Sequence, residues 1–235
     1  MGGDRLWRIM AEFSSGGVSE PGAVRLCEVC ASVSLMSGAG IMLMAGEAQG
    51  SLCSSNAVSA LIEELQYTHR EGPSIDAFDQ DQPVLEPDLA DPVTYRWFAF
   101  TPAAVKAGAR AVFGFPLQVG KVRIGALNLY RDRPGPLTVE QHADLLVLAG
   151  VAALAVLGMQ ADASPGGLGG ELEREGNFRF VVYQAAGMVS EELGISVADA
   201  LARLRAYAFG NDQLVTDVAR EVVNRQLRFD DQAPL

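Results

Sequence analysis

The chain has 235 residues, of which 49% are hydrophobic and 20% charged, and its formal net charge at pH 7 is −11. This composition is typical of a soluble globular protein with one sizeable core and a satellite domain. An acidic chain is not attracted nonspecifically to nucleic acid or anionic membranes, so RNA binding would require its few arginines to gather on one surface.

The N-terminal sequence, MGGDRLWRIM, lacks the apolar core of a signal peptide, and Leu6 stands where a myristoylation motif has Ser or Thr. The longest uncharged apolar run, residues 145–159, is shorter than the roughly 20 residues that span a membrane. We therefore expect a cytoplasmic protein in which this run is a buried helix. Either its own domain or the same helix of a second subunit would cover it.

Helical and strand-like patterns alternate before residue 160. Apolar periodicity predicts helices at 22–36, 57–68 and 137–159. Strands are expected at 40–45, 51–55, 111–119 and 122–130. The last two flank Gly120-Lys121, a two-residue hairpin loop that suits a type II′ turn. The pattern predicts an α+β fold, in which helices pack on an antiparallel sheet.

Three cysteines, Cys27, Cys30 and Cys53, occur in a chain without an export signal. This odd number favours reduced thiols and no disulfide. Cys27 and Cys30 have the C-x-x-C spacing of redox and zinc sites, but they lie in a helical pattern without a second pair, and both histidines are distant. We expect a structural role for them and no metal site.

Five blocks of residues carry a family resemblance. They are Glu71-Gly72-Pro73-Ser74-Ile75-Asp76-Ala77, Asp88-Leu89, Arg96-Trp97, Phe115-Pro116-Leu117 and Ile124-Gly125-Ala126-Leu127-Asn128-Leu129. Together they resemble the GAF domain, a cytosolic sensory module, over about residues 5 to 160. Related proteins often have Cys at the position of Ser74, so a thiol-dependent function there is in doubt. The resemblance implies a cavity between the sheet and its helices, where some members bind small molecules such as cyclic nucleotides or chromophores.

Residues of suitable type and position are candidate walls of such a ligand cavity. They are Met42, Met44, Cys53, Phe98, Phe113, Phe115 and Asn128, with Asp88 as a polar anchor. The alternative is that these side chains fill a closed core, since inward-facing strand residues are apolar in any such sheet. The aromatic cluster around Trp97 either forms a lid over the cavity or covers a sheet edge. The sequence does not identify a ligand or cofactor.

A Gly-rich segment, residues 163–170, separates two predicted domains, 1–162 and 171–235. Beyond it, apolar stripes predict three short helices between residues 178 and 223. Gly194 ends the first, Ser196 and Asp199 form a variant capping box for the second, and Gly210-Asn211 end the second and cap the third. The three stripes predict a small helical bundle.

The same tail carries a second resemblance. It rests on Gln184-Ala185-Ala186-Gly187-Met188, Ala200, Leu204-Arg205, Ala208, Asn211 and Asp217-Val218-Ala219. These resemble the ANTAR domain, a three-helix RNA-binding module of bacterial transcription antiterminators. The resemblance implies binding of paired hairpin loops in nascent RNA, which prevents a terminator hairpin. The family usually has Lys where this chain has Ala186, so a cation expected to meet phosphate is missing.

Helical spacing places Arg179, Tyr183, Ala186 and Ser190 on one expected solvent face. An Arg one turn from a Tyr suits stacking against unpaired RNA bases. The candidate RNA-binding residues are Arg179, Tyr183, Gln184, Ala186, Gly187, Arg203, Arg205 and Arg220. The alternative is an ordinary solvated face, because residues 171–235 hold seven Arg and no Lys against eleven Asp and Glu, a formal charge of −4.

We predict a signal-responsive antitermination regulator whose C-terminal domain binds RNA hairpin loops under control of the N-terminal sensor. The alternative is a dimerisation or protein-interaction regulator whose bundle has lost RNA affinity. Both predict a cytoplasmic homodimer. No nucleophile elbow, phosphate loop or dinucleotide fingerprint occurs, so we do not expect an enzyme. A methionine-sulfoxide-type reductase would need a resolving cysteine near its reactive one.

Overall fold

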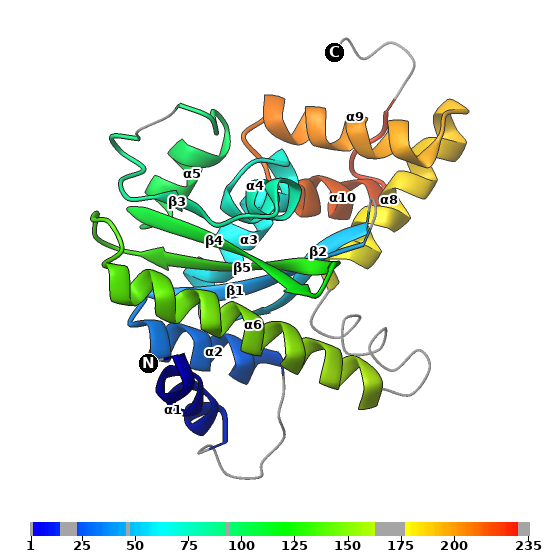
Figure 1. Cartoon of the computed structure of the whole chain (residues 1–235). Coiled ribbons are helices and arrows are strands. Elements are labelled where there is room, and N and C mark those ends of the chain that lie inside the picture. Colours follow the sequence, from blue (N-terminus) through cyan, green and yellow to red (C-terminus); the bar gives the residue numbers. More distant parts are fainter. Residues whose placement is uncertain (1, 15–22, 46–47, 93–94, 163–176, 230–235) are drawn as a thin grey trace. The chain divides into compact units, whose positions relative to one another are not determined.

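The computed structural model of the chain describes residues 2–14, 23–45, 48–92, 95–162 and 177–229 (Figure 1). The chain divides into two compact units, Met1–Leu168 and Gly169–Leu235. We describe each unit by itself. The predicted linker, residues 163–170, lies outside the described residues.

The first unit combines helices with a sheet. Its helices are α1 (Gly2–Ser14), α2 (Ala23–Ser34), α3 (Ala57–His69), α4 (Pro73–Gln80), α5 (Phe100–Lys106) and α6 (Val139–Asp162). Its strands are β1 (Gly38–Ala45), β2 (Ala48–Ser54), β3 (Val84–Glu86), β4 (Ala111–Val119) and β5 (Val122–Arg131). They form a five-stranded antiparallel sheet in the order β2-β1-β5-β4-β3, which confirms the predicted α+β arrangement.

The β4–β5 hairpin has the predicted two-residue loop. Val119 pairs with Val122, and Gly120 between them has a φ of 61°, the left-handed region that this turn requires. The first hairpin differs from the prediction, because β2 begins at Ala48 rather than at residue 51. Residues Ala48, Gln49 and Gly50 extend the strand by pairing with β1. Cross-strand pairing therefore outweighs the turn tendency of Gly50.

Helices cover both faces of this sheet. Figure 1 shows α2 and α6 on one side and α3 and α4 on the other. Because cross-strand partners point to the same face, the row Gly40, Asn128 and Gly114 across β1, β5 and β4 belongs to one face. This row faces α3 and α4, since an added methyl group at Gly40 would meet Glu63 and one at Gly114 would overlap the Pro73 carbonyl.

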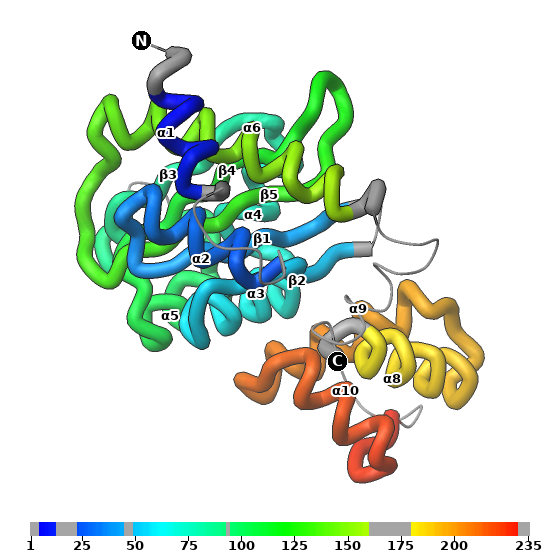
Figure 2. Tube along the Cα trace, turned by 90° about the horizontal axis from the view of Figure 1, so that it is seen from below, coloured from blue at the N-terminus to red at the C-terminus, as the bar shows by residue number. Residues whose placement is uncertain are grey.

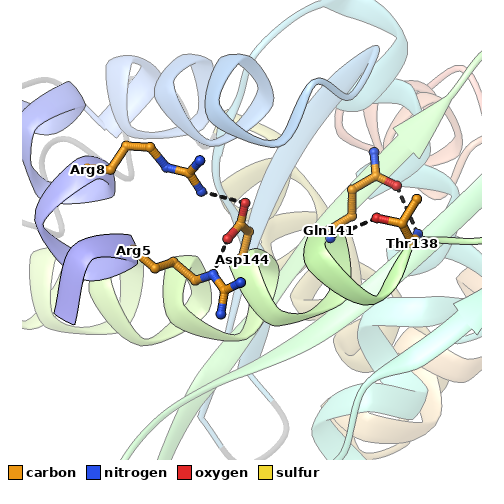
Figure 3. A network of polar contacts seen from close by, with 5 residues as sticks. All are labelled: Arg5, Arg8, Thr138, Gln141 and Asp144. Carbon is orange, nitrogen blue, oxygen red and sulfur yellow. Dashed lines mark hydrogen bonds and ion pairs between the residues drawn. The ribbon is translucent and has the colours of Figure 1, made fainter. Parts of the chain in front are cut away.

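The N-terminal helix α1, which the sequence patterns do not predict, lies against α6 (Figure 2). Figure 3 shows the polar contacts: both Arg5 and Arg8 pair with Asp144, the latter at 2.6 Å. Thr138 and Gln141 exchange side-chain to backbone hydrogen bonds at the start of α6, at 3.1 and 3.0 Å. These bonds form a capping box that satisfies the first turn of the helix.

Helix α6 contains the long apolar run. Its residues Val139–Met159 are long and apolar enough to cross a membrane by length and composition alone. In the structure this helix packs on β4, β5 and α2, and Leu145, Leu148 and Val156 are buried. A core helix therefore explains the run, as the sequence predicts, whereas Leu146 and Leu154 remain exposed.

The second unit contains α8 (Asn177–Leu193), α9 (Val197–Gly210) and α10 (Val215–Val223). Their apolar stripes meet through the buried Val182, Val189, Leu204 and Val218, which confirms three packed helices. Ser196 caps α9 and accepts a hydrogen bond from Asp199 N at 3.1 Å, as predicted. The predicted cap of the third helix is wrong: Leu214, rather than Asn211, occupies that position, because a turn intervenes.

Candidate functional site

A cluster of buried polar side chains lies between the sheet and the helices α3 and α4. Glu63 and Gln66 come from successive turns of α3, Ser74 from the first turn of α4 and Asn128 from the middle of β5. All four are at most 2% exposed. The glycines opposite them, Gly40 and Gly114, allow the helices to approach the sheet closely because they have no side chains.

Glu63 is the ionisable member of this cluster. Burial raises the pKa of its carboxyl group to about 8, and the neighbouring Asn128 amide only partly offsets that rise. Since neutral pH lies below this value, the carboxyl group is mostly protonated and can donate as well as accept a hydrogen bond.

Most polar atoms of the cluster lack a well-formed hydrogen bond within the described residues. The exception is Gln66 Oε1, which accepts from Ser74 N at 2.7 Å. Both carboxyl oxygens of Glu63, both amide atoms of Asn128, Gln66 Nε2 and Ser74 Oγ have no partner of hydrogen-bond geometry among these residues, although Asn128 is near enough to Glu63 to lower its pKa. A buried polar atom left unpaired costs about 1–3 kcal/mol, so this concentration makes the cluster a candidate binding site.

The chemistry of the cluster favours a particular kind of ligand. Its groups at neutral pH are a carboxylic acid, two amides and a hydroxyl, all of which can donate and accept hydrogen bonds. Among the described residues, the one buried arginine, Arg131, lies on the opposite face over the Phe113 ring. No buried cation therefore balances a phosphate here, and the cluster is suited to a neutral polar molecule.

The structure separates the predicted cavity residues. Met42, Met44 and Asn128 are buried on the α3 and α4 face. Phe113 and Phe115 lie on the opposite face, where Phe115 contacts His142 of α6. Their assignment to the same cavity as Met42 is wrong, because alternation along each strand sends neighbouring residues to opposite faces. On that face they fill the core beneath α6.

Two other predicted ligand contacts have different surroundings. Phe98 is 78% exposed, so its assignment to a cavity wall is wrong. Asp88 is bound by Arg110, whose Nη2 lies 3.0 and 3.3 Å from the two carboxylate oxygens, and it accepts from Ala90 N. The Arg110 hydrogen bond lowers the pKa of Asp88. This carboxylate therefore organises its own loop.

The loop around Trp97 is fixed to the segment that carries Ser74. Trp97 is buried and its indole N–H donates to Asp76 Oδ2 at 3.1 Å. Glu71 Oε2 accepts from the backbone N–H groups of Ala99 and Phe100, at 2.9 and 3.1 Å, at the start of α5. The two acidic residues of the Glu71–Ala77 block thus hold this loop against α4.

Sequence reasoning missed Glu63 and Gln66. The available signal was their position: both lie in a helical segment where the surrounding residues, Ile62 and Leu65, belong to the apolar face. A polar residue on such a face is unusual unless a partner satisfies it.

The prediction of reduced cysteines is wrong for two of the three. Cys27 of α2 and Cys53 of β2 form a disulfide, with their Cα atoms 6.0 Å apart. Helix α2 packs across β1 and β2 and brings together residues separated by 26 positions, which no spacing rule could show. Cys30 stays free and buried, and burial raises its pKa to about 12. A thiol in this environment is not a reactive nucleophile.

In the second unit, the predicted RNA-binding residues of α8 divide into exposed and buried positions. Tyr183, Gln184 and Gly187 are exposed. Ala186 is completely buried, so its expected place on the solvent face is wrong. The reason is that α8 packs on both α9 and α10, which widens its buried stripe beyond the one face that spacing suggests. The Arg179 side chain lies outside the described residues.

Arg203 and Arg205, two of the predicted arginines that the structure describes, point to different sides of α9. Arg203 and Arg205 are half-buried, and a separation of two residues turns them about 160° apart around α9. Arg220 of α10 is exposed and pairs with Asp217 at 2.6 Å. The bundle therefore lacks a concentrated basic patch built from these three residues.

Comparison with known proteins identifies the first unit. Residues 23–157, more than half of the chain, match the GAF domain family. The chain therefore belongs to the GAF domain family, and its N-terminal unit is a sensory regulatory domain. No curated protein matches the chain.

Several solved structures resemble it at low identity. The GAF domain of a phosphoenolpyruvate-protein phosphotransferase from Coxiella burnetii is 12% identical, with a TM-score of 0.49 over 68% of this chain and 95% of that one. The equivalent Acinetobacter domain is 14% identical, with a TM-score of 0.47 over 69% and 96%. A GAF domain/HD domain protein from Geobacter sulfurreducens is 16% identical, with a TM-score of 0.45 over 63% and 100%.

Proposed function

We propose that this chain is a cytoplasmic, signal-responsive regulator whose GAF domain binds a neutral polar small molecule at the Glu63–Asn128 cluster. The observation that supports this ligand is the group of unpaired atoms at Glu63, Gln66, Ser74 and Asn128. A molecule with several donors and acceptors would satisfy them and would stabilise the closed packing of α3 and α4 on the sheet.

The ligand can be sought in the protein as it is purified. We expect heat or acid denaturation of the wild type to release a small molecule without a phosphate group, detected by mass spectrometry. Asn128→Ala, which removes two of the unpaired atoms, should release much less, and Asn224→Ala, at an exposed position on α10's end, should release as much as the wild type. A phosphorylated compound, or equal release from all three proteins, would contradict the proposal.

For the regulatory output, meaning the activity that the GAF domain controls, we propose that the C-terminal bundle binds hairpin loops of nascent RNA and thereby promotes transcription antitermination. The support is the resemblance of the tail to the ANTAR domain together with the exposed face of α8. Phe180 and Tyr183 are 64% and 37% exposed, and Gln184 and Gly187 lie beside them. Aromatic rings next to an amide and an open glycine suit stacking and edge recognition of unpaired bases.

A direct binding measurement tests this output. We expect a two-hairpin leader RNA to bind the wild type with an affinity that falls as salt rises. Tyr183→Ala should weaken binding about tenfold or more, in line with roughly 1–3 kcal/mol per stacked base. Tyr95→Ala, which removes an exposed tyrosine of the GAF unit, is the matched control. Equal binding by both variants would refute the assignment of this face.

The second candidate output is protein interaction. The dispersed arginines and the acidic tail favour it, as does the completely buried Ala186 at the position where the related domains usually have Lys. In that case the exposed aromatic face of α8 would contact a protein, and the wild type would bind no leader RNA at low salt.

We further infer that the function is regulatory rather than catalytic. A reductase of the sulfoxide type requires a thiolate that meets its substrate. Cys27 and Cys53 lie close enough to form a disulfide, so the pair meets the requirement for a resolving cysteine. All three cysteines are nevertheless at most 4% exposed, which supports a structural role for them. Methionine sulfoxide reduction by the purified protein in the presence of a thiol reductant would refute this inference, and no such reduction would agree with it.

A further inference from the structure

The disulfide between Cys27 and Cys53 fastens the outer strand of the GAF sheet to a helix. Strand β2, which carries Cys53, is the outermost strand in the order β2-β1-β5-β4-β3. Helix α2, which carries Cys27, packs across both β1 and β2, and the two Cα atoms are 6.0 Å apart. An edge strand is held by pairing on one side only, so this covalent link gives β2 a second attachment.

An irregularity in the β1–β2 ladder aims Cys53 at that helix. Cys53 pairs with Ile41, but the next residue of β1, Met42, pairs with Ser51. The register therefore shifts here, and Leu52 is left as an extra residue. Because cross-strand partners point to the same side of a sheet, Cys53 faces α2 whereas Ser51 faces α3 and α4. In a regular strand, residues two apart would share one face, so this bulge re-aims the Cys53 side chain.

The third cysteine does not compete for this pair. Cys30 lies one turn after Cys27 on the buried side of α2, but burial raises its pKa to about 12. Its thiol therefore stays protonated at neutral pH, and the thiolate is the form that attacks a disulfide. Exchange at the Cys27–Cys53 pair consequently needs a thiolate from outside the chain.

The GAF unit has a core that does not depend on the disulfide. Domains that require disulfides are mainly small ones, which cannot build a sufficient hydrophobic core. Here large apolar side chains are buried along the sheet and α6, among them Phe113, Phe115, Leu127 and Leu145. The link joins residues only 26 positions apart. We therefore expect the unit to stay folded when the link is broken, with α2 and β2 held less firmly.

A disulfide in a cytoplasmic protein is usually transient, because glutathione and thioredoxin keep thiols reduced. We propose that Cys27 and Cys53 form a reversible thiol–disulfide switch, through which the GAF unit responds to the low-molecular-weight thiols and disulfides of the cell. The switch borders two parts of the unit: β2 lies beside β1, whose Gly40 lies against Glu63, and α2 packs on α6, the last helix of the unit. This inference rests on the cytoplasmic location proposed above, and not on the ligand or RNA assignments.

Reduction of the switch proceeds through two thiol–disulfide exchanges. The thiolate of a small thiol such as glutathione attacks the sulfur of Cys53, the S–S bond breaks, and Cys27 leaves as a thiolate that takes up a proton. A second small thiolate attacks the small-molecule sulfur of the mixed disulfide, so Cys53 becomes a thiol and the small disulfide is released. Cys53 is 4% exposed and Cys27 is completely buried, so the attack requires local opening of the edge strand. Oxidation is the reverse reaction, with the small disulfide as oxidant.

Titration of the purified full-length protein with glutathione tests the switch. The wild type is equilibrated at a series of ratios of reduced to oxidised glutathione, quenched with acid and alkylated in denaturant, and its intact mass is measured. Since Cys30 alone is free in the oxidised form, we expect the chain to gain two further alkyl groups within the range of cytoplasmic ratios. It should lose them again when oxidised glutathione is restored. Cys30→Ser is the matched control and should gain two groups over the same range. A disulfide that persists throughout that range, or one that does not re-form, would overturn the proposal.

Hydrogen exchange shows whether the two states differ in structure. The amides of α2, β2 and α6 should exchange roughly tenfold faster or more in the reduced wild type than in the oxidised one. Cys27→Ser and Cys53→Ser, each of which removes the link, should show the fast exchange in both buffers, and the comparison within the wild type stands even where a variant does not fold. Identical exchange in the two wild-type states would overturn the switch. Neither measurement uses the ligand or RNA, so its failure is distinct from theirs.

Discussion

Replacement of Glu63 by Gln should make the GAF unit less sensitive to pH. In the unfolded chain the Glu63 carboxyl ionises near its ordinary value of 4.5, whereas burial keeps it protonated in the folded chain until the pH approaches 8. Between these two values unfolding releases a proton. The free energy of unfolding of the wild type must therefore fall as pH rises through this window, and the protein should be most stable below it.

The size of this effect follows from the shift in pKa. A rise from 4.5 to about 8 corresponds to roughly 5 kcal/mol at about 1.36 kcal/mol per unit. Most of it, roughly 3 kcal/mol, falls between pH 5 and pH 8. Glu63→Gln has a similar shape but does not titrate, so it lacks this contribution. The wild type and Glu63→Gln should therefore have similar dependence on denaturant at low pH, and the free energy of unfolding of the variant should exceed that of the wild type increasingly as pH rises.

Urea unfolding followed by tryptophan fluorescence measures this difference. Both tryptophans, Trp7 and Trp97, belong to the first unit, so their signal reports that unit and not the bundle. Glu28→Gln, at an exposed carboxylate of α2, is the control and should follow the wild type at every pH. Parallel curves for the wild type and Glu63→Gln between pH 5 and pH 8 would refute the reasoning.

Three further changes test other parts of the structure. Ala186→Lys should destabilise the bundle by about 1–3 kcal/mol in thermal unfolding because it overpacks a buried site. The neighbouring Gly187→Ala has open space around it and should stabilise the bundle by about 0.5–1 kcal/mol. A more stable Ala186→Lys and a less stable Gly187→Ala would contradict the packing of α8. Cys53→Ser, or reduction of the wild type, should cost the GAF unit about 2–4 kcal/mol, and equal stability of both forms would argue against the disulfide. Gly114→Ala should destabilise the same unit by about 1–3 kcal/mol, because the added methyl group overlaps the Pro73 carbonyl. Gly150→Ala is the control, since no atom lies near the added methyl group there. Gly108 is unsuitable as a control because its φ is positive.

The candidate site shows where sequence reasoning reached its limit. Local patterns placed the strands well enough to select Met42, Met44 and Asn128, which share a face in the structure. The same reasoning added Phe113 and Phe115, because residue type alone does not say which face of a sheet a side chain takes. The face depends on strand register, and register depends on pairing with β1 and β5, which is not local in sequence.

The C-terminal unit shows the same limit in a helical setting. Periodicity correctly gave three helices and the Ser196 cap, since both depend on residues within a turn of each other. It placed Ala186 on the solvent side, because a single stripe was assumed. The burial of Ala186 arises from α8 contacting two partner helices at once, and the number of partners is a property of the packed bundle.

The sequence by itself determined the class of fold, the β4–β5 hairpin loop, the helical nature of the tail and the resemblance to a GAF domain. These features depend on periodicity, turn chemistry and short motifs, all of which act over a few residues. Only the tertiary structure decided which polar groups become buried without partners and that Cys27 meets Cys53. Each of these joins residues from elements far apart in the chain, and their proximity comes from packing, which local patterns do not encode.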